Sequence, residues 1–355
     1  MRKKFVWIVA MITLLLVFAS FVGCGTTSEK NSGNEADSGN KNGQEKETYH
    51  IDLYTHKSGS TTYVLGAGLA DLINKNSDWL TATALESPGA IPNLLVLRDQ
   101  PELRKNAMVV GYAYQAMVGV TPFEEDFDEL REIAGIGVSG NFFLSNNPKI
   151  RTIKDLEGKR VGFGTKPSLG LVDQPMNYLE KEGISVKAEF LGNAAADEMR
   201  DGKIDAIFNG ALCASPDYTK WAPLPALAEL LAMDDVNFIS LNEDILHESM
   251  ADVGMPLIPG AVTVPPGGFH ESQTEPLVIR GEATSWVVHK DMPDEVIKEV
   301  LRIIYENADA FGDLLPAGNY ICKETMTRVG SPEIMHPAAV DFYREKGLKI
   351  PVLDD

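Results

Sequence analysis

The chain has 355 residues, of which 44% are hydrophobic, so it can build one large domain or two medium ones around a buried core. Its formal net charge of −19 at pH 7 excludes nucleic-acid binding through a basic patch. The cysteines and histidines match no metal-ligand spacing, and we expect neither a metal nor another cofactor. Cys213 and Cys322 either form an extracytoplasmic disulfide or are isolated thiols, and both alternatives stay open.

Residues 1–23 are predicted to be a secretory signal peptide, because three basic residues precede an apolar run over 5–22. The run alone is also long enough for a membrane-spanning helix. The sequence Phe21-Val-Gly-Cys24 favours cleavage, since it resembles the lipobox of bacterial lipoproteins, with Phe where Leu is more usual. The resemblance implies a diacylglycerol on Cys24 that anchors the protein to the outer face of the bacterial cytoplasmic membrane.

The segment 24–48 is predicted to be a disordered tether that carries this lipid. After the cysteine it has no aromatic and no branched aliphatic residue. It therefore cannot bury enough apolar surface to fold. The folded part is expected to begin near Tyr49.

Residues 49–76 predict a strand, a loop and a helix. The helix is indicated by apolar residues at 65, 69, 72 and 73, the spacing of one buried face. A hydroxyl residue within 60–62 can serve as its N-cap. Free backbone N–H groups and the helix dipole at this end favour a carboxylate or another anion. Gly66 and Gly68 inside the helix indicate close approach of a neighbouring element.

The pattern of alternating strands and helices continues twice along the chain. A first β-α-β-α-β unit comprises the strands 50–54, 79–84 and 106–114, a helix that follows the turn 57–62 and runs to 76, and a helix over 91–97. Ligands bind beyond the carboxyl ends of such strands, and three of these ends converge, at 55–63, 87–93 and 112–115. Another strand follows over 130–138.

A second β-α-β-α-β unit is predicted over 141–210. Its strands are expected at 141–145, after a Gly-Val-Ser-Gly break, and at 160–164, 186–190 and 203–209, the last ending in Asn209-Gly210. Asp173 is the expected cap of the helix that follows the loop 165–170. Later elements are predicted as a helix over 226–233, a strand over 236–240, a Pro- and Gly-rich stretch over 256–269, a strand over 286–288, and helices over 293–311 and 336–346.

Catalytic motifs are missing from the sequence: it has no Gly-x-Ser-x-Gly elbow, dinucleotide fingerprint or Walker loop. We therefore predict that the protein is not an enzyme. Two lobes with Gly, Ser and Thr loops at their strand ends favour a binding protein with a ligand cleft that closes by a hinge. Lys166 is either a solvated loop lysine or a cation that faces an anionic ligand, and Tyr112 is either a packing residue or a ligand contact.

Several stretches resemble the solute-binding subunits of tripartite ATP-independent periplasmic (TRAP) transporters, in the TAXI family (TRAP-associated extracytoplasmic immunogenic). Ser60-Thr-Thr-Tyr-Val-Leu-Gly66 is similar to the family's Gly-Thr-Tyr-Tyr-Pro-Leu-Gly. Pro88-Gly-Ala with Asn93-Leu94 resembles Gly-Gly-Ser…Asn-Leu. His336-Pro-Ala-Ala…Tyr343-Arg-Glu-Lys-Gly347 resembles the terminal His-Pro-Gly-Ala…Tyr-x-Glu-x-Gly.

This resemblance implies an α/β, type II periplasmic-binding-protein fold, with two doubly wound lobes joined by a hinge and a ligand cleft between them. Lobe 1 would comprise 49–140 and 276–355, and lobe 2 would comprise 141–275. The ligand would be a small organic anion, often glutamate or a related dicarboxylate. The partner would be a sodium-driven membrane permease, and the protein would be a monomer.

The expected ligand-binding residues come from the strand ends and from these matches: Lys57, Ser60, Thr61, Thr62, Tyr63, Gly89, Ala90, Asn93, Tyr112, Lys166, Ser168, Asn209 and Gly210. Some depart from the family pattern: Ala90 replaces a Ser, Tyr112 stands where many members carry Asp, and Leu169-Gly170 replaces Gly-Thr. The ligand is therefore open. The alternatives are a substrate-binding lipoprotein of an ABC importer and a ligand-sensing surface lipoprotein.

Overall fold

The computed structural model describes residues 48–119, 123, 127–233 and 235–351. The predicted signal peptide, Cys24 and nearly all of the tether lie outside these ranges. Within them, no helix has the length and apolar character needed to cross a membrane.

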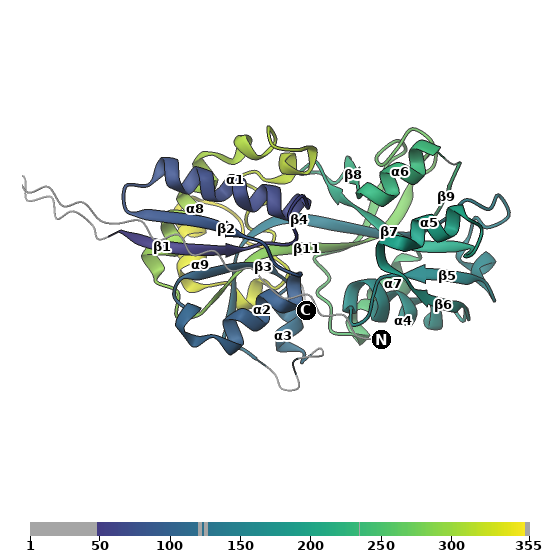
Figure 1. Ribbon diagram of the computed structural model, residues 1–355, viewed down its shortest axis with the longest axis horizontal. Coiled ribbons are helices and arrows are strands. Elements are labelled where there is room, and N and C mark those ends of the chain that lie inside the picture. Colours follow the sequence, from purple (N-terminus) through teal and green to yellow (C-terminus); the bar gives the residue numbers. More distant parts are fainter. Residues whose placement is uncertain (1–47, 120–122, 124–126, 234, 352–355) are drawn as a thin grey trace, which may run out of the picture. The chain divides into compact units, whose positions relative to one another are not determined.

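In the described residues, one mixed sheet contains eleven strands (Figure 1). They are β1 Tyr49–Tyr54, β2 Leu80–Leu85, β3 Ala107–Gly111, β4 Leu130–Ser145, β5 Arg160–Phe163, β6 Lys187–Phe190, β7 Ala206–Cys213, β8 Trp221–Pro223, β9 Asn237–Ile239, β10 Pro259–Val264 and β11 Leu277–His289. The main path runs in the order β2-β1-β3-β11-β4-β7-β5-β6. The α-helices are α1 Thr61–Asn76, α2 Ala90–Asp99, α3 Tyr114–Met117, α4 Gln174–Lys181, α5 Ala195–Arg200, α6 Pro225–Met233, α7 Glu243–Asp252, α8 Asp294–Glu306 and α9 Pro337–Glu345.

The sheet consists of two parallel groups joined by two long antiparallel strands. β1 is parallel to β2 and β3, and β5 is parallel to β6 and β7. β11 is antiparallel to β3 and to β4, and β4 is antiparallel to β7. In Figure 1, β4 and β11 run side by side from one parallel group to the other. These two strands are therefore the connection on which both groups depend.

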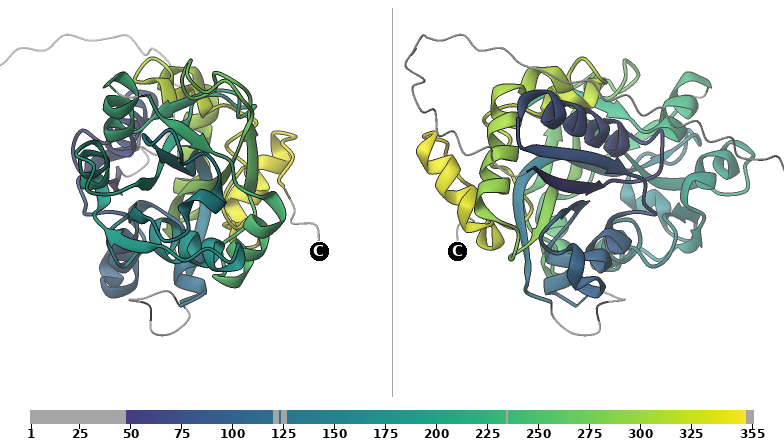
Figure 2. Two further views of the ribbon diagram at one scale, coloured as in Figure 1. Left: turned by 90° about the vertical axis from the view of Figure 1, so that its right-hand side faces the viewer. Right: turned by 60° about the vertical axis from the view of Figure 1, so that its left-hand side comes forward.

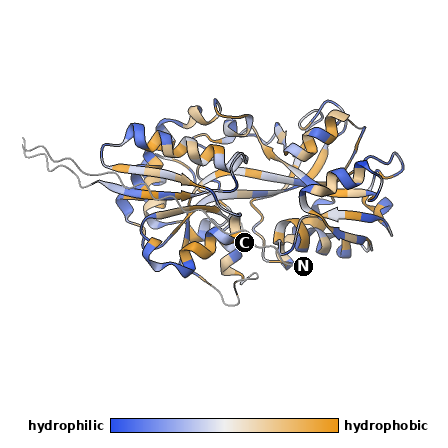
Figure 3. Cartoon of the chain, viewed as in Figure 1, coloured by the Kyte–Doolittle hydropathy of each residue, from blue (hydrophilic) through white to orange (hydrophobic). Residues whose placement is uncertain are grey.

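Helices with one apolar face cover the sheet. α1 packs along β1 and β2, as the right-hand view of Figure 2 shows, and it buries Leu65, Leu69 and Ile73. α8 buries Val296, Val300 and their neighbours on one face, as the predicted amphipathic helix requires, but it ends at Glu306 and a 3-10 turn follows. Figure 3 shows the resulting mixture of hydrophobic and hydrophilic residues along the covering helices.

The close approach predicted for the helix glycines is confirmed. A Cβ on Gly66 would overlap the Thr55 side chain, and one on Gly68 would overlap Leu314. The Ser60 side chain caps α1 by accepting from the Tyr63 N–H at 3.3 Å. The loop, cap and buried face of this unit were therefore readable from local spacing alone.

Three predicted boundaries are wrong. β4 runs unbroken over 16 residues, where two strands separated by a break were expected. Gly140 does not end the strand, because its missing side chain makes room for Trp221 and Ile279, 2.5 Å from where a Cβ would stand. β7 continues past Asn209-Gly210 to Cys213, since both residues pair with β4.

The third wrong boundary concerns Asp173, which makes no side-chain cap. A π-helical turn, Leu169–Asp173, leads into α4, and Ser168 caps that turn by accepting from the Leu171 N–H at 3.2 Å. Four elements were not predicted: α3, α7, β8 and β10. β11 is also much longer than the predicted strand over 286–288. The prediction was too short because polar residues interrupt the apolar run of this strand.

Candidate functional site

The N-terminus of α1 supplies the first part of the candidate site. The first four N–H groups of a helix have no intrahelical acceptor. Here the Ser60 Oγ accepts from Tyr63, and the Ser60 carbonyl accepts from Val64 at 3.0 Å. Thr61 and Thr62 are the first two residues of α1, so their N–H groups have no intrahelical acceptor. This end of α1 can therefore donate several hydrogen bonds to one ligand group.

A small cavity of about 20 Å³ lies against this helix end. Its wall comes from α1, β4, β7, β11 and a residue before the last helix: Thr61, Thr62, Leu65, Ile136, Gly137, Leu212, Cys213, Thr284 and Ala317. The predicted residues Thr61 and Thr62 thus meet the two long connecting strands. Most of the wall is apolar, with three hydroxyl groups.

From Thr284, a row of polar residues extends along one face of the connecting strands. Because alternate strand residues share a face, Arg280, Glu282 and Thr284 lie together on β11. Their partners on β4 are Asn141, Ser139 and Gly137. We call these six residues the polar row.

The far end of the polar row is a buried ion pair. Arg280 is 1% exposed, and its Nη2 lies 3.1 Å from Oε2 of Glu282. Nη2 also donates to Asn141 Oδ1, and Tyr114 donates its hydroxyl proton to Glu282 Oε1. The Nε of Arg280 is buried with no acceptor among the described residues. A buried guanidinium with an unused N–H can donate a further hydrogen bond to an anionic or carbonyl oxygen.

Two tyrosines cover the row from the segment that leads into α3. Tyr112 accepts a hydrogen bond from the Thr284 hydroxyl at 3.2 Å. Burial, with the Glu282 carboxylate nearby, raises the pKa of Tyr112 to about 12 and that of Tyr114 well above its usual value. Both phenols therefore keep their protons at neutral pH, so each can donate one hydrogen bond, which Tyr114 gives to Glu282.

A second helix start faces the ion pair. Ser168 caps the π turn that leads into α4. Gly170, two residues later, is the second residue of that turn. A Cβ on Gly170 would stand 2.8 Å from Arg280 Nη1 and 2.9 Å from Glu282 Oε2. Glycine is needed there because the charged side chains fill the space a Cβ would take.

The structure brings only some of the predicted site residues to the polar row. Thr61, Thr62 and the cap Ser60 are at one end, and Tyr112 contacts Thr284. Ser168 reaches the row through the turn that carries Gly170. Gly210 lies beside the polar row. It has no side chain, and this makes room for the side-chain amide of Asn141.

Other predicted residues lie elsewhere or are engaged in the fold. Asn93 is fully buried and donates to the carbonyls of Thr55 at 2.7 Å and Val110 at 2.8 Å, which ties β1 to β3. The Asn209 Oδ1 accepts from the next N–H, at 2.7 Å. Residue 209 alternates with 210, so it points to the opposite face of β7.

Gly89 precedes α2 with φ 145°, Ala90 is the first residue of that helix, and both are half-buried. Tyr63 is half-buried in the first turn of α1, and Lys57 is exposed in the loop before it. None of these four lines the small cavity beside α1.

Lys166 is exposed, and its Nζ stands 4.1 Å from the centre of the Phe190 ring. It lines a different hollow, of about 640 Å³, between α4 and the segment that leads into β6. The two predicted lysines therefore do not share the small cavity with Thr61 and Thr62.

Sequence reasoning missed Arg280, Glu282, Tyr114, Asn141 and Thr284. A signal was present, since Arg280 and Glu282 are the only charged residues in the mostly apolar run 277–288. Charged residues are almost never buried unless paired. Two charges of opposite sign, two positions apart in such a run, indicate a buried pair on one strand face.

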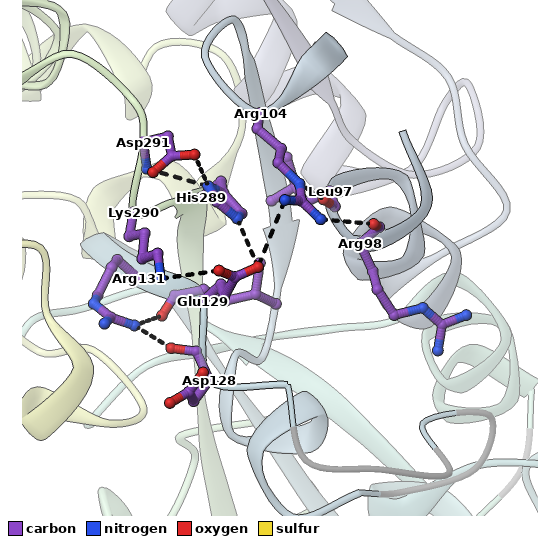
Figure 4. Close-up of polar contacts among 10 residues, drawn as sticks. Leu97, Arg98, Arg104, Asp128, Glu129, Arg131, His289, Lys290 and Asp291 are labelled. Carbon is purple, nitrogen blue, oxygen red and sulfur yellow. Dashed lines mark hydrogen bonds and ion pairs between the residues drawn. The ribbon is translucent and has the colours of Figure 1, made fainter. Parts of the chain in front are cut away.

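A separate charged cluster fixes the start of β4 (Figure 4). Glu129 accepts from Lys290 Nζ at 2.9 Å and lies 3.3 Å from the Nε2 of His289, which is fully buried. Arg104 Nη1 is 3.6 Å from the same carboxylate. The Asp291 N–H donates to His289 Nδ1 at 3.1 Å, which places the proton of the neutral ring on Nε2. The cluster joins the end of β11 to the segment before β4 and does not touch the polar row.

Both cysteines in the described residues are free thiols. Cys213 is buried in β7, and burial raises its pKa to about 11. Cys322 is half-buried and its Sγ lies 3.1 Å from Glu324 Oε2. The disulfide alternative is therefore not realised in this structure.

Comparison with known proteins gives one family and one fold. The sequence model of the NMT1-like family matches residues 53–347. No curated protein sequence matches the chain. The periplasmic sulfonate-binding protein SsuA of a sulfonate ABC transporter from Methylobacillus flagellatus is 10% identical over 87% of this chain and 99% of its own, with a TM-score of 0.50.

Two further solved structures are similar at lower scores. A TctC solute-binding protein from Polaromonas is 14% identical over 85% of this chain and 90% of its own, with a TM-score of 0.46. MatC from Rhodopseudomonas palustris with bound malate is 13% identical over 84% and 96%, with a TM-score of 0.47. The likeness to SsuA shows the fold, and the predicted α/β periplasmic-binding-protein fold is confirmed.

Proposed function

Because the chain belongs to the NMT1-like family and has a periplasmic-binding-protein fold, we propose that it is an extracytoplasmic solute-binding protein and not an enzyme. It captures a small organic anion, glutamate-like or another carboxylate, and delivers it to a membrane permease. The predicted signal peptide and the lipid on Cys24 hold it, as a monomer, at the outer face of the cytoplasmic membrane.

The buried guanidinium of Arg280 is the observation that carries this proposal. Its Nε has no acceptor among the described residues, and the polar row leads from it to the N-terminus of α1. A ligand carboxylate would bind Arg280 beside Glu282 or in its place. The phenol of Tyr112 would be a further donor, and that of Tyr114 would be one where the ligand takes the place of Glu282. Thr61 and Thr62 would hold the other end of the ligand. The other ligand-binding residues that were predicted from the sequence are also proposed as ligand contacts.

The connecting strands support a hinge. The proposed lobe boundary between residues 140 and 141 falls inside β4, and the boundary between 275 and 276 falls just before β11. The chain would then pass from one lobe to the other at two places, both of them where the two parallel groups of strands are joined. Ligand contacts from α1 on one side and from the turn around Gly170 on the other would favour closure.

The terminal stretch from His336 to Gly347, with the stretch Ser60–Gly66, supports a TRAP permease of the TAXI type as the partner. The rival is an ABC importer. A neighbouring gene for a large multi-span permease supports the first, and a neighbouring gene for an ATPase supports the second.

Ligand capture is tested on the purified protein in two steps. Any small molecule that co-purifies is released by denaturation and weighed by mass spectrometry. Thermal unfolding is then followed with a panel of L-glutamate, L-malate, succinate and taurine. A ligand at a hundredfold excess over its Kd stabilises by about 2.7 kcal/mol.

The matched variants are Arg280→Gln and Arg302→Gln. Arg302 is a partly exposed arginine on α8 with its own ion pairs, so its variant controls for the loss of one positive charge. We expect Arg280→Gln to lose the stabilisation and Arg302→Gln to keep it. Equal stabilisation of both variants contradicts the role of Arg280, and the absence of both a co-purified acid and any stabilisation contradicts the capture of an organic anion.

A further inference from the structure

Glu132 is a buried carboxylate that the ligand site does not use directly. It is fully buried in β4. Its Oε1 accepts from the Ala113 N–H at 3.2 Å. Its Oε2 accepts from the Ser331 N–H at 2.9 Å and from the Ser285 hydroxyl at 3.3 Å. One side chain thus joins β4 to β11, to the segment before α3 and to the chain before α9.

The bond to Ala113 matters because of its two neighbours. Tyr112 and Tyr114 flank Ala113, and their hydroxyls bind Thr284 and Glu282 of the polar row. α3 has only four residues, so few helical bonds hold this segment. The contact with Glu132 fixes the backbone midway between the two phenols.

We infer that Glu132 is a positioning residue that holds Tyr112 and Tyr114 over the polar row, and that protonation of its carboxyl releases them. The inference rests on the proposed function only in taking the polar row as the ligand site. The chemistry is one proton taken up from solvent by a carboxylate oxygen. That oxygen then becomes a donor and a much weaker acceptor for an N–H group.

The hydrogen bonds indicate which oxygen takes the proton. Oε2 would give up two donors, Ser331 and Ser285, whereas Oε1 would give up only Ala113. Protonation at Oε1 therefore costs fewer contacts, and it breaks the bond that holds the tyrosines. Burial raises the pKa of Glu132 to about 6, so the change falls close to neutral pH.

The groups that donate hydrogen bonds directly to this carboxylate are uncharged in the part of the chain that the structure describes. Its hydrogen-bond donors are backbone N–H groups and the Ser285 hydroxyl. The titratable or charged side chains on the elements packed against it are Tyr112 and Tyr114 before and in α3, Arg280, Glu282 and His289 on β11, Arg131 on β4, and Glu333 and His336 before and at the start of α9. Burial lowers the pKa of both histidines, and His336 donates its backbone N–H to the Glu132 carbonyl at 2.9 Å.

Hydrogen–deuterium exchange of the whole protein without ligand tests the inference. Exchange is measured by mass spectrometry at pH 7.5 and pH 5.0, with the intrinsic pH dependence of exchange removed. In the wild type, protection over 112–118 should fall about tenfold at pH 5.0, since a hydrogen bond to a charged group is lost. Glu132→Gln should show the low protection at both pH values.

Glu129→Gln is the matched control, because this carboxylate lies three residues away and contacts His289 and Lys290 instead. It should keep the wild-type pH profile over 112–118. The inference is overturned if Glu132→Gln folds and retains wild-type protection there. It is also overturned if wild-type protection is unchanged at pH 5.0 or falls equally along the whole chain, and this comparison needs no variant. Since no ligand is added, these outcomes do not depend on ligand capture.

Discussion

Arg280 and Glu282 stand two residues apart on one face of β11, with Nη2 and Oε2 separated by 3.1 Å and both side chains almost completely buried. Removing one partner of a buried pair leaves an uncompensated charge, which typically costs about 3–5 kcal/mol. Replacing both by apolar residues removes that charge. The pair therefore determines how the centre of the sheet responds to substitution.

A double-mutant cycle measures this coupling. We expect Arg280→Met and Glu282→Leu each to lower the free energy of unfolding by about 3–5 kcal/mol. The double variant should lose less than the sum of the two, with a coupling of about 1–3 kcal/mol. Urea unfolding of the four proteins provides the measurement. Additive losses would show that the two groups act independently.

Gly170→Ala tests the packing around the same pair. A Cβ would stand within 3 Å of both charged side chains, so the pair has to shift. We expect a loss of about 1–3 kcal/mol, typical of an overpacked interior. Gly137→Ala is the control, because nothing lies within 4 Å of its added Cβ. A larger loss for Gly137→Ala than for Gly170→Ala would contradict this account.

The pH dependence of stability should carry the signature of Glu132. Its pKa rises from 4.5 in the unfolded chain to about 6 in the folded one. The folded state therefore binds more protons between these values, and stability from this group increases as the pH falls through 6 towards 4.5. The total change is about 2 kcal/mol. Urea unfolding of the wild type and of Glu132→Gln at pH 7 and pH 4.5 isolates the contribution of Glu132 to this change in stability.

Glu129 should show the opposite sign in the same experiment. The side chains of Lys290 and His289 lower the pKa of this carboxyl. Its contribution is therefore present above the unfolded pKa and is lost as the pH falls. If Glu129→Gln and Glu132→Gln shift the pH dependence in the same direction, at least one of these assignments is incorrect.

The two cysteines should differ in reactivity. Cys213 is 1% exposed and its pKa is raised to about 11, so little thiolate forms at pH 8. Cys322 is half-buried. Iodoacetamide on the folded protein, with the sites mapped by peptide mass spectrometry, should modify Cys322 well before Cys213. In urea, where the chain is unfolded, the two cysteines should be modified at equal rates. Equal rates of modification in native buffer as well would contradict the burial of Cys213.

Local features of the sequence predicted much of the fold. The face of α1, a hydroxyl cap within 60–62 and the buried stripe of α8 follow from residue types at local spacings, and the structure selects Ser60 as the cap. Such patterns act over a few residues, and no distant partner has to be known. The alternation of strands and helices likewise indicated the correct fold class.

The connecting strands and the polar row were decided by tertiary structure. Arg280 binds Asn141, which is 139 residues away in the chain, and no local pattern selects that partner. Gly140 and Gly210 resemble strand ends in the sequence, but each makes room for a side chain from another strand. The sequence by itself determined most of the elements and the helix start proposed to bind an anion. Only the packing of β4 against β11 placed a buried arginine in line with that helix start, because strand pairing brings together residues that the chain keeps far apart.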